Sequence, residues 1–143
     1  MSLGSQLDDA LDQAPKQATV EVTDGERRAE VDVTDVDRLG VKVRRVKVHR
    51  QAPRPIAEEA RALPERLRSL PERVEPVEVD PELGGASLRS RPGDMRDREF
   101  FQVDIEGEDE VEVRRYKAKE GGREELDWVM TRGQLGRLLD ELD

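Results

Sequence analysis

Apolar residues alternate with charged or polar residues along much of the chain, and this period of two is typical of strands with one buried face. Val20 and Val22 begin the pattern, and Asp24-Gly25 follows as a dipeptide typical of tight hairpin turns. The alternation resumes from Ala29 to Val33. The sequence therefore predicts a β-hairpin over residues 18–34.

The next alternating run changes phase in its middle. Its apolar positions are odd-numbered before Arg44-Arg45 and even-numbered after it: Val41, Val43, Val46 and Val48. A β-bulge inserts one extra residue into a strand, so a bulge at the two arginines would return all four valines to one face. We therefore expect a bulged strand here.

A shift of 70 residues aligns this run with residues 111–118, which carry a second double arginine, Arg114-Arg115, where we expect a second bulge or strand bend. The same shift places Val33 on Val103, and each half ends near an amphipathic helix. Two pseudo-repeats, 19–73 and 74–143, each a strand-rich unit ending in a helix, would explain these coincidences. Chance matching among strands rich in Val, Arg and Glu is the alternative.

Further alternating runs predict a short strand at Val77 and Val79 and three clearer strands, at residues 101–105, 111–118 and 126–130. The segment from Pro81 to Arg98 contains Gly84-Gly85, several arginines and few apolar residues. We interpret it mainly as a mobile loop, with an edge strand at Leu88 as the alternative.

Spacings of three and four predict the helices. The strongest such pattern comprises Ile56, Ala60, Leu63, Leu67, Leu70 and Val74. Pro64 and Pro71 interrupt it, so we expect two short helices or one helix kinked at Leu63, with Pro64 opening the second piece. The apolar side is expected to pack on the sheet, and a coiled coil is the alternative.

A second helix is predicted near the end of the sequence, where Thr131 and Gln134 have the spacing of a capping box. This helix is expected to bury Leu135, Leu138, Leu139 and Leu142. Leu3, Leu7 and Leu11 are also spaced four apart, but their segment is short and ends at Pro15. Residues 1–18 are therefore predicted to be a flexible or frayed helical segment.

These elements predict an α+β protein with antiparallel sheet and two amphipathic helices. The expected organisation is the N-terminal segment 1–18 followed by a single α+β domain, 19–143, within which the two pseudo-repeats would lie. Because the interior of so small a domain is thin, we expect a homodimer to bury additional apolar area.

The formal charge of −9 opposes nonspecific attraction to nucleic acid and to anionic membranes. The absence of cysteine excludes disulfides, thiolate catalysis and thiolate metal sites. Neither a signal sequence nor a membrane-spanning apolar run is recognised, so a cytoplasmic location is expected. The preference for Arg over Lys and the lack of Asn suggest a GC-rich bacterial genome.

The polar sides of the two double-arginine strands carry basic residues that could follow a nucleic-acid backbone. The candidate contact residues are Lys42, Arg44, Lys47, Arg114, Lys117 and Lys119. Cross-strand ion pairing with neighbours such as Glu21, Glu30 and Asp32 is the interpretation we favour. Single-strand binders also use stacking aromatic residues, and the four in this chain are expected mostly at inward-facing positions: Phe100, Phe101, Tyr116 and Trp128.

No catalytic, cofactor-binding or metal-binding residue is assigned. His49 is the only histidine, which excludes multi-histidine metal sites and a serine-type triad with a spare imidazole. The acidic stretches 32–37 and 106–110 do not have EF-hand spacing, and no glycine-rich phosphate loop follows a predicted strand.

Strand groups closed by a helix, above all the run from Val111 through Thr131 to Leu142, resemble in outline the Whirly, Pur-alpha and positive-cofactor type of single-strand binders. A small acidic chain with this order of helices and strands also resembles the type III secretion chaperones, which are dimers that bind effector segments. Both resemblances concern architecture alone. We expect a non-enzymatic binding or assembly protein, with single-stranded nucleic-acid binding and capture of a partner polypeptide as the alternatives.

Overall fold

The computed structural model describes residues 2–91 and 98–143, which form three helices and nine strands. The first half of the chain contains α1 (Leu3–Gln13), β1 (Ala18–Asp24), β2 (Arg27–Val36), β3 (Gly40–His49) and α2 (Ile56–Arg66). The second half contains β4 (Val74–Asp80), β5 (Gly85–Ser90), β6 (Glu99–Glu106), β7 (Glu110–Lys119), β8 (Gly122–Leu126), β9 (Trp128–Thr131) and α3 (Arg132–Leu142).

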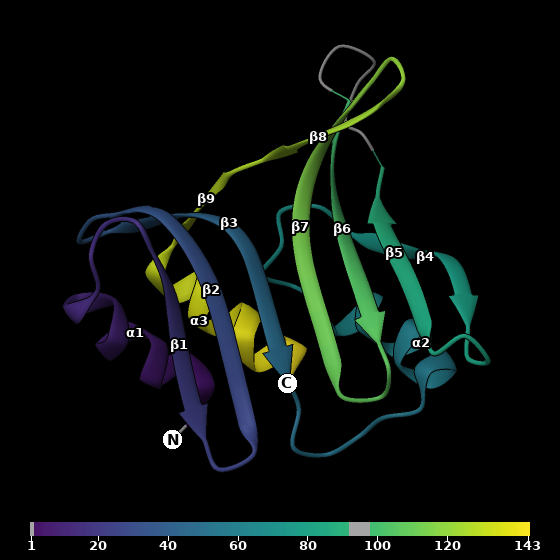
Figure 1. Cartoon of the computed structure of the whole chain (residues 1–143), viewed down its shortest axis with the longest axis horizontal. Helices are drawn as coiled ribbons and strands as arrows, with labels where there is room; N and C mark the ends of the chain where they lie inside the picture. Colours follow the sequence, from purple (N-terminus) through teal and green to yellow (C-terminus); the bar gives the residue numbers. More distant parts are fainter. Residues whose placement is uncertain (1, 92–97) are drawn as a thin grey trace.

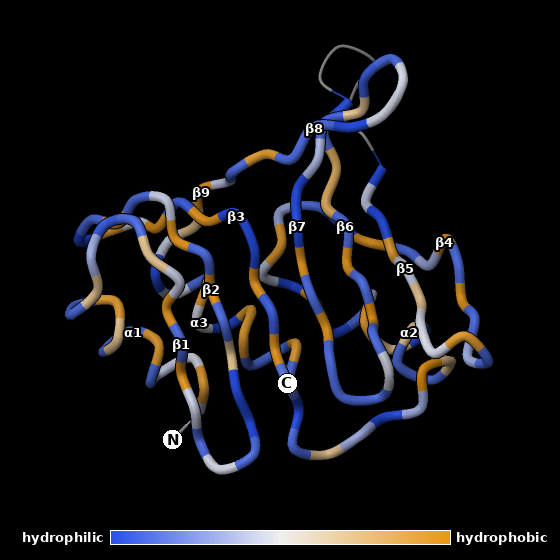
Figure 2. Tube along the Cα trace, in the orientation of Figure 1, coloured by the Kyte–Doolittle hydropathy of each residue, from blue (hydrophilic) through white to orange (hydrophobic). Residues whose placement is uncertain are grey.

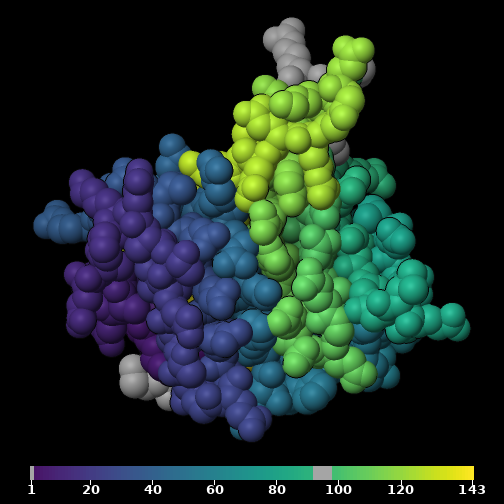
Figure 3. Space-filling view, in the orientation of Figure 1, coloured from purple at the N-terminus to yellow at the C-terminus, as the bar shows by residue number. Residues whose placement is uncertain are grey.

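All nine strands form one antiparallel sheet in the order β1-β2-β3-β7-β6-β5-β4, with β8 paired to β7 and β9 paired to β3. Helices α2 and α3 lie behind the sheet in Figure 1, and α1 packs beside α3 under β1 and β2. The opposite face, which we call the open face, carries no helix in the described part of the chain and faces the viewer in Figure 3. The predicted α+β class with antiparallel sheet is confirmed, with three helices instead of two.

Apolar and polar positions alternate along the strands as predicted (Figure 2). The apolar side chains of one sheet face join those of the three helices in a single buried core. The first hairpin forms as expected, because Gly25 at its turn has a φ of 65°, which a glycine adopts without a steric penalty.

The N-terminal segment forms a helix that is packed on the rest of the protein, whereas the sequence predicts a flexible or frayed helical segment. Leu3, Leu7 and Leu11 are all buried. Gly4 crosses α3 so closely that a Cβ atom there would lie 2.2 Å from the carbonyl oxygen of Gly136. Tertiary packing on α3 therefore stabilises a helix that would be marginal in isolation.

Helix α2 ends at Arg66, and the second piece expected after Pro64 does not form. The amide of Leu67 closes the last turn on Leu63. The next amides, of Arg68 and Ser69, donate to the Glu141 carboxylate on α3. Because a side chain accepts from both amides, the chain can leave the helix without leaving these two donors unpaired. Leu63, Leu67 and Leu70 are buried, as predicted.

The phase change in β3 is confirmed as a bulge. Asp32 and Val33 on β2 pair with Arg45 and Val43, which leaves Arg44 as the extra residue. The second bulge, expected at Arg114-Arg115 in β7, does not form. β6 and β7 pair without a register shift from Glu99 to Glu106, so this prediction is wrong. The pseudo-repeat remains a prediction, and it no longer has a shared bulge to support it.

The interpretation of residues 81–98 as mainly a mobile loop is wrong where β5 forms. Leu88 is buried in β5, which pairs with β4 on one side and β6 on the other. Residues 92–97 of the expected loop lie outside the described residues. None of the helices in the described part of the chain is long and apolar enough to cross a membrane.

Candidate functional site

The two double arginines meet at the middle of the sheet. Arg45 lies directly opposite Arg114 where β3 and β7 pair. Both strands change partners at this point. The first part of β3 pairs with β9 and its second part with β7, while the first part of β7 pairs with β3 and its second part with β8. The motifs that suggested a repeat therefore mark the place where both strands change neighbours.

Each of these arginines has an acidic partner. Arg44 contacts Asp127 at 2.7 Å, and Arg45 contacts Asp32 at 3.0 Å and Glu30 at 3.2 Å. Arg114 contacts Glu112 and, at 2.9 Å, Glu125, while Arg115 lies 3.5 Å from Glu72 and 3.8 Å from Glu99. The hydrogen bond that Arg44 donates to Asp127 raises the pKa of Arg44. Like charges that face each other across the strands are thus neutralised by a surrounding layer of carboxylates.

The structure does not bring the six predicted basic residues together on one surface. Lys47 lies on the open face and contacts Glu110 at 3.4 Å, while Lys42 is exposed opposite Asp35. Lys117 and Lys119 are exposed near the end of β7 and have the same strand parity as buried Val113. They therefore project to the other side of the sheet from Arg114, and a continuous basic stripe is absent among these residues.

His49, which also belongs to β3, has partners on both ring nitrogens. Its Nδ1 lies 3.0 Å from Glu110, and its Nε2 lies 2.9 Å from a guanidinium nitrogen of Arg28. The side chain is held within the charged layer of the open face. In residues 2–91 and 98–143, no group of three or more His, Asp or Glu side chains is placed to hold a metal ion.

Two aromatic residues expected to face inward lie on the open face. Phe100 and Tyr116 are paired across β6 and β7, with ring centroids 5.8 Å apart. The guanidinium of Arg89 lies 5.3 Å from the centre of the Phe100 ring, and that of Arg123 lies 3.9 Å from the centre of the Tyr116 ring. These cations already occupy the positions over the rings that a stacked ligand would need.

One glutamine holds both cations of this cluster. The buried Gln102 accepts hydrogen bonds from Arg89 at 2.9 Å and Arg123 at 2.6 Å, and its amide donates to Asp104 at 3.0 Å. Burial raises the pKa of Tyr116. The hydrogen bonds of this open-face cluster are therefore satisfied within the cluster, which shields Phe100 from water.

The other two aromatic residues, Phe101 and Trp128, do face inward, and their rings make an edge-to-face contact with centroids 5.4 Å apart.

A buried carboxylate, which the sequence reasoning missed, fastens α2 to α3. Glu59 is 2 % exposed and lies 2.6 Å from Arg50, 2.6 Å from Arg66 and 3.3 Å from Arg54. Only the Arg54 contact has hydrogen-bond geometry; the other two are close ion pairs. The signal was present, since Glu59 occupies the i+3 position of an apolar side that begins at Ile56.

Two of these arginines also reach the last turn of α3. Arg50 donates to the carbonyl of Leu142 at 2.8 Å, and Arg66 donates to the carbonyl of Glu141 at 2.6 Å. Burial lowers the pKa of Arg50 to about 10, although Glu59 acts in the opposite direction. Cations at a helix C-terminus interact favourably with its unpaired carbonyls, so this cluster has a structural role.

Exposed apolar residues, in contrast, are found at the β4 edge of the sheet. β4 ends the strand order, and its Val77 and Val79 are 58 % and 42 % exposed. Leu83, in the turn after β4, is 85 % exposed. These three residues form the apolar edge patch. Large apolar side chains gathered at one sheet edge are typical of an interaction surface.

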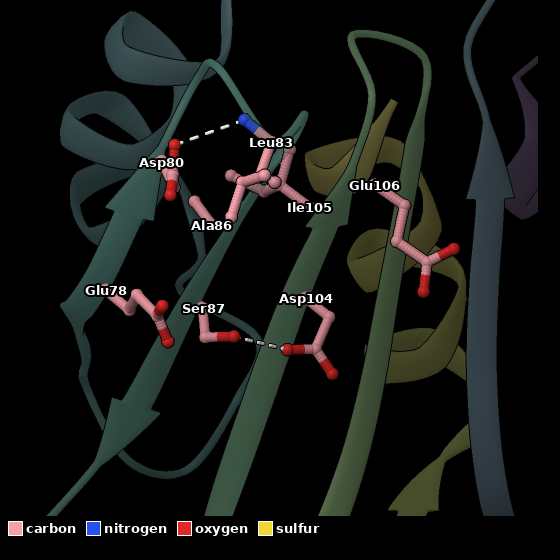
Figure 4. Close-up of a pocket in the computed structure, with 9 residues that line it drawn as sticks. Glu78, Asp80, Leu83, Ala86, Ser87, Asp104, Ile105 and Glu106 are labelled. Atoms are coloured by element: carbon pink, nitrogen blue, oxygen red, sulfur yellow. Dashed lines mark hydrogen bonds between the residues drawn. The ribbon is translucent and has the colours of Figure 1, made fainter.

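An acidic depression of about 250 Å³ adjoins this patch on the open face, across β4, β5 and β6 (Figure 4). Glu78, Asp80, Asp104 and Glu106 contribute carboxylates to it. Asp104 accepts a hydrogen bond from Ser87 at 2.7 Å. No ion-pair partner of Glu78, Asp80 or Glu106 is found among the described residues, so the depression has negative charge that folding does not neutralise.

Gly85 forms part of the floor of this depression. It pairs with Asp80 on one side and Glu106 on the other, so the two acidic residues flank a position without a side chain. A Cβ atom at Gly85 would lie 3.2 Å from the carbonyl oxygen of Ile105. The tight backbone approach favours glycine here, and the glycine leaves space on the sheet surface between the strands that carry Asp80 and Glu106.

Comparison with known proteins does not identify a function for this site. The sequence matches no protein-family model, and no curated protein or solved structure matches the chain.

Proposed function

We propose that the protein is a non-enzymatic binding module that captures an extended, basic polypeptide segment as an additional strand beside β4. The observation that carries this proposal is the apolar edge patch on the last strand of the sheet, next to an unneutralised acidic depression. An extended peptide that joins a sheet edge gains main-chain hydrogen bonds, while its alternate side chains provide specificity.

The features of β4 restrict which strand can join it. Pro76 has no amide donor, and the pairing with β5 shifts between Pro76 and Glu78. Proline and bulges on an edge strand hinder indiscriminate pairing. The accessible part of the edge is therefore its second half, Glu78 to Asp80, together with the exposed Leu83.

Charge favours a basic partner. A second copy of this chain would bring Glu75, Glu78 and Asp80 close to the same acidic residues, and like charges across strands are destabilising. A lysine or arginine side chain entering beside Gly85 would instead lie between Asp80 and Glu106. The expected homodimer therefore remains a prediction, and this edge is a poor surface for it.

Nucleic-acid binding receives less support than polypeptide capture. The double arginines have acidic partners, the predicted lysines are divided between two sides of the sheet, and arginines already cover the open-face aromatic rings. Binding of single-stranded DNA at physiological salt, lost when Arg44 and Arg114 are replaced by alanine, would reverse this preference.

The test is fluorescence anisotropy with a labelled peptide of alternating Lys and Val. Leu83→Lys should raise the Kd by about tenfold or more, because burying a leucine is worth about 1.5–3 kcal/mol and tenfold corresponds to about 1.4 kcal/mol. Leu39→Lys is the matched control, since Leu39 is 79 % exposed and lies in the β2–β3 turn. A peptide N-methylated at alternate residues should not bind, because it cannot pair with a strand.

Two results would contradict the proposal. Equal loss of affinity in the Leu39 and Leu83 variants would show that binding is not located at the β4 edge. Unchanged affinity for the N-methylated peptide would show that a strand is not added. A peptide of alternating Glu and Val should bind at least about tenfold more weakly than the Lys-Val peptide, given the unneutralised carboxylates.

A further inference from the structure

A second concave surface lies between the loop that follows α2, strand β9 and helix α3. It encloses about 520 Å³. Clefts that bind small molecules usually measure about 300–1,000 Å³. This hollow is separate from the β4 edge, because none of its lining residues belongs to the acidic depression or the apolar edge patch.

One side of the hollow is apolar. Leu70 and Pro71 contribute from the loop, and Val129 and Met130 contribute from β9. Val129 is 71 % exposed, although it lies in a strand between two largely buried residues, Trp128 and Met130. An apolar ligand lying against Val129 would remove this side chain from water.

The hydrogen-bond acceptors in the hollow are already engaged. Both carboxylate oxygens of Glu141 accept bonds, from the amides of Arg68 and Ser69 at 3.1 and 3.0 Å and from the Ser69 hydroxyl at 2.9 Å. The side-chain oxygen of Gln134 accepts the amide of Thr131 at 2.9 Å, which leaves the Gln134 amide group as a donor.

The cations in the hollow, by contrast, have no carboxylate partner among the described residues. Arg68 donates only a long bond of 3.4 Å, from its Nε to the carbonyl of Glu65. Arg137 makes no ion pair or hydrogen bond with the described residues. The double arginines at the centre of the sheet, in contrast, all contact acids.

We propose that this hollow binds a small amphiphilic anion, with its carboxylate held by Arg68 and Arg137 and its apolar tail against Pro71 and Val129. Unused donors at one side, engaged acceptors and an apolar wall with exposed Pro71 and Val129 all favour this class of ligand. A guanidinium binds a carboxylate through charge-assisted hydrogen bonds, and two such groups fix the position of the head group.

The probe for the test is decanoate, titrated below its micellar concentration and followed by calorimetry and by the fluorescence of Trp128, the only tryptophan. Decanoate should bind, and decanol should bind at least about tenfold more weakly. Arg68→Gln with Arg137→Gln should raise the Kd for decanoate by about tenfold or more. The matched control is Arg61→Gln, an exposed arginine on α2 outside the hollow.

A second variant separates loss of the site from loss of the fold. Val129→Asp places a charge on the apolar wall at an exposed position, so it should abolish decanoate binding while leaving thermal unfolding unchanged. Equal binding of decanol and decanoate would overturn the proposal. So would undiminished binding by the double arginine variant, or binding of an acidic apolar peptide without any binding of decanoate.

Discussion

The two ends of the sheet use their apolar residues differently. At the β1 end, Val20 and Val22 are buried and the leucines of α1 pack beneath them, so the apolar side chains of this region contribute to folding. At the β4 end, Val77, Val79 and Leu83 remain largely exposed. Apolar area that folding leaves in water is available for association. The β1 end therefore contributes to folding, and the β4 end is the one that we propose for binding.

The helices beneath the two ends are also attached by different means. Helix α1 is held by an apolar stripe, whereas α2, which packs on β4 and β5, also buries Glu59 among three arginines. An apolar stripe tolerates small changes in volume, whereas a buried charge must keep its partners. The β4 end is therefore expected to be more sensitive to a single polar substitution in its helix.

The largest effect is expected for Glu59→Gln. Removing the carboxylate leaves the three arginines close together without their counterion, and breaking a buried pair in this way costs about 3–5 kcal/mol. The control is Glu58→Gln, the exposed neighbour on the same helix, which should change stability by less than about 0.5 kcal/mol. Chemical denaturation measures both, and a loss below about 1 kcal/mol for Glu59→Gln would contradict the structural role of the cluster.

A somewhat smaller loss of stability is expected when the apolar stripe of α1 is shortened. Leu7→Ala should cost about 2–5 kcal/mol, because Leu7 is fully buried between the sheet and α3. Leu83→Ala, at the other end, should stay within about 0.5 kcal/mol of the unaltered protein. If both variants lost equal stability, the β4 end would be part of the folded core and the difference between the two ends would not exist.

The sequence predicted the elements of both ends better than it predicted their positions. Alternation located most of the strands and the bulge at Arg44, and residue spacing located the capping box of Thr131 and Gln134, because each of these depends on neighbouring residues alone. The same local pattern places Val77 in a strand. It cannot show that this strand ends the sheet, since the order of strands depends on contacts between distant segments.

The misses have related causes. The apparent phase change at Arg114-Arg115 predicts a bulge, but Tyr116 turns outward to pair with Phe100, and Arg115 lies 4.4 Å from the Phe101 ring. Aromatic residues and arginines can occupy either side of a strand, so polarity alone does not determine their direction. The packed α1 was missed because its stabilisation comes from α3, more than a hundred residues away in the sequence.

Amide hydrogen exchange, resolved by residue with NMR, tests the difference between the two ends most directly. It should be measured with and without the alternating Lys-Val peptide, because an added strand protects amides that otherwise exchange from the sheet edge. Slower exchange is expected within residues 77–80 of β4, with no change in residues 18–24 of β1. Unchanged exchange in β4, or equal protection at both edges, would contradict the capture of a strand at β4.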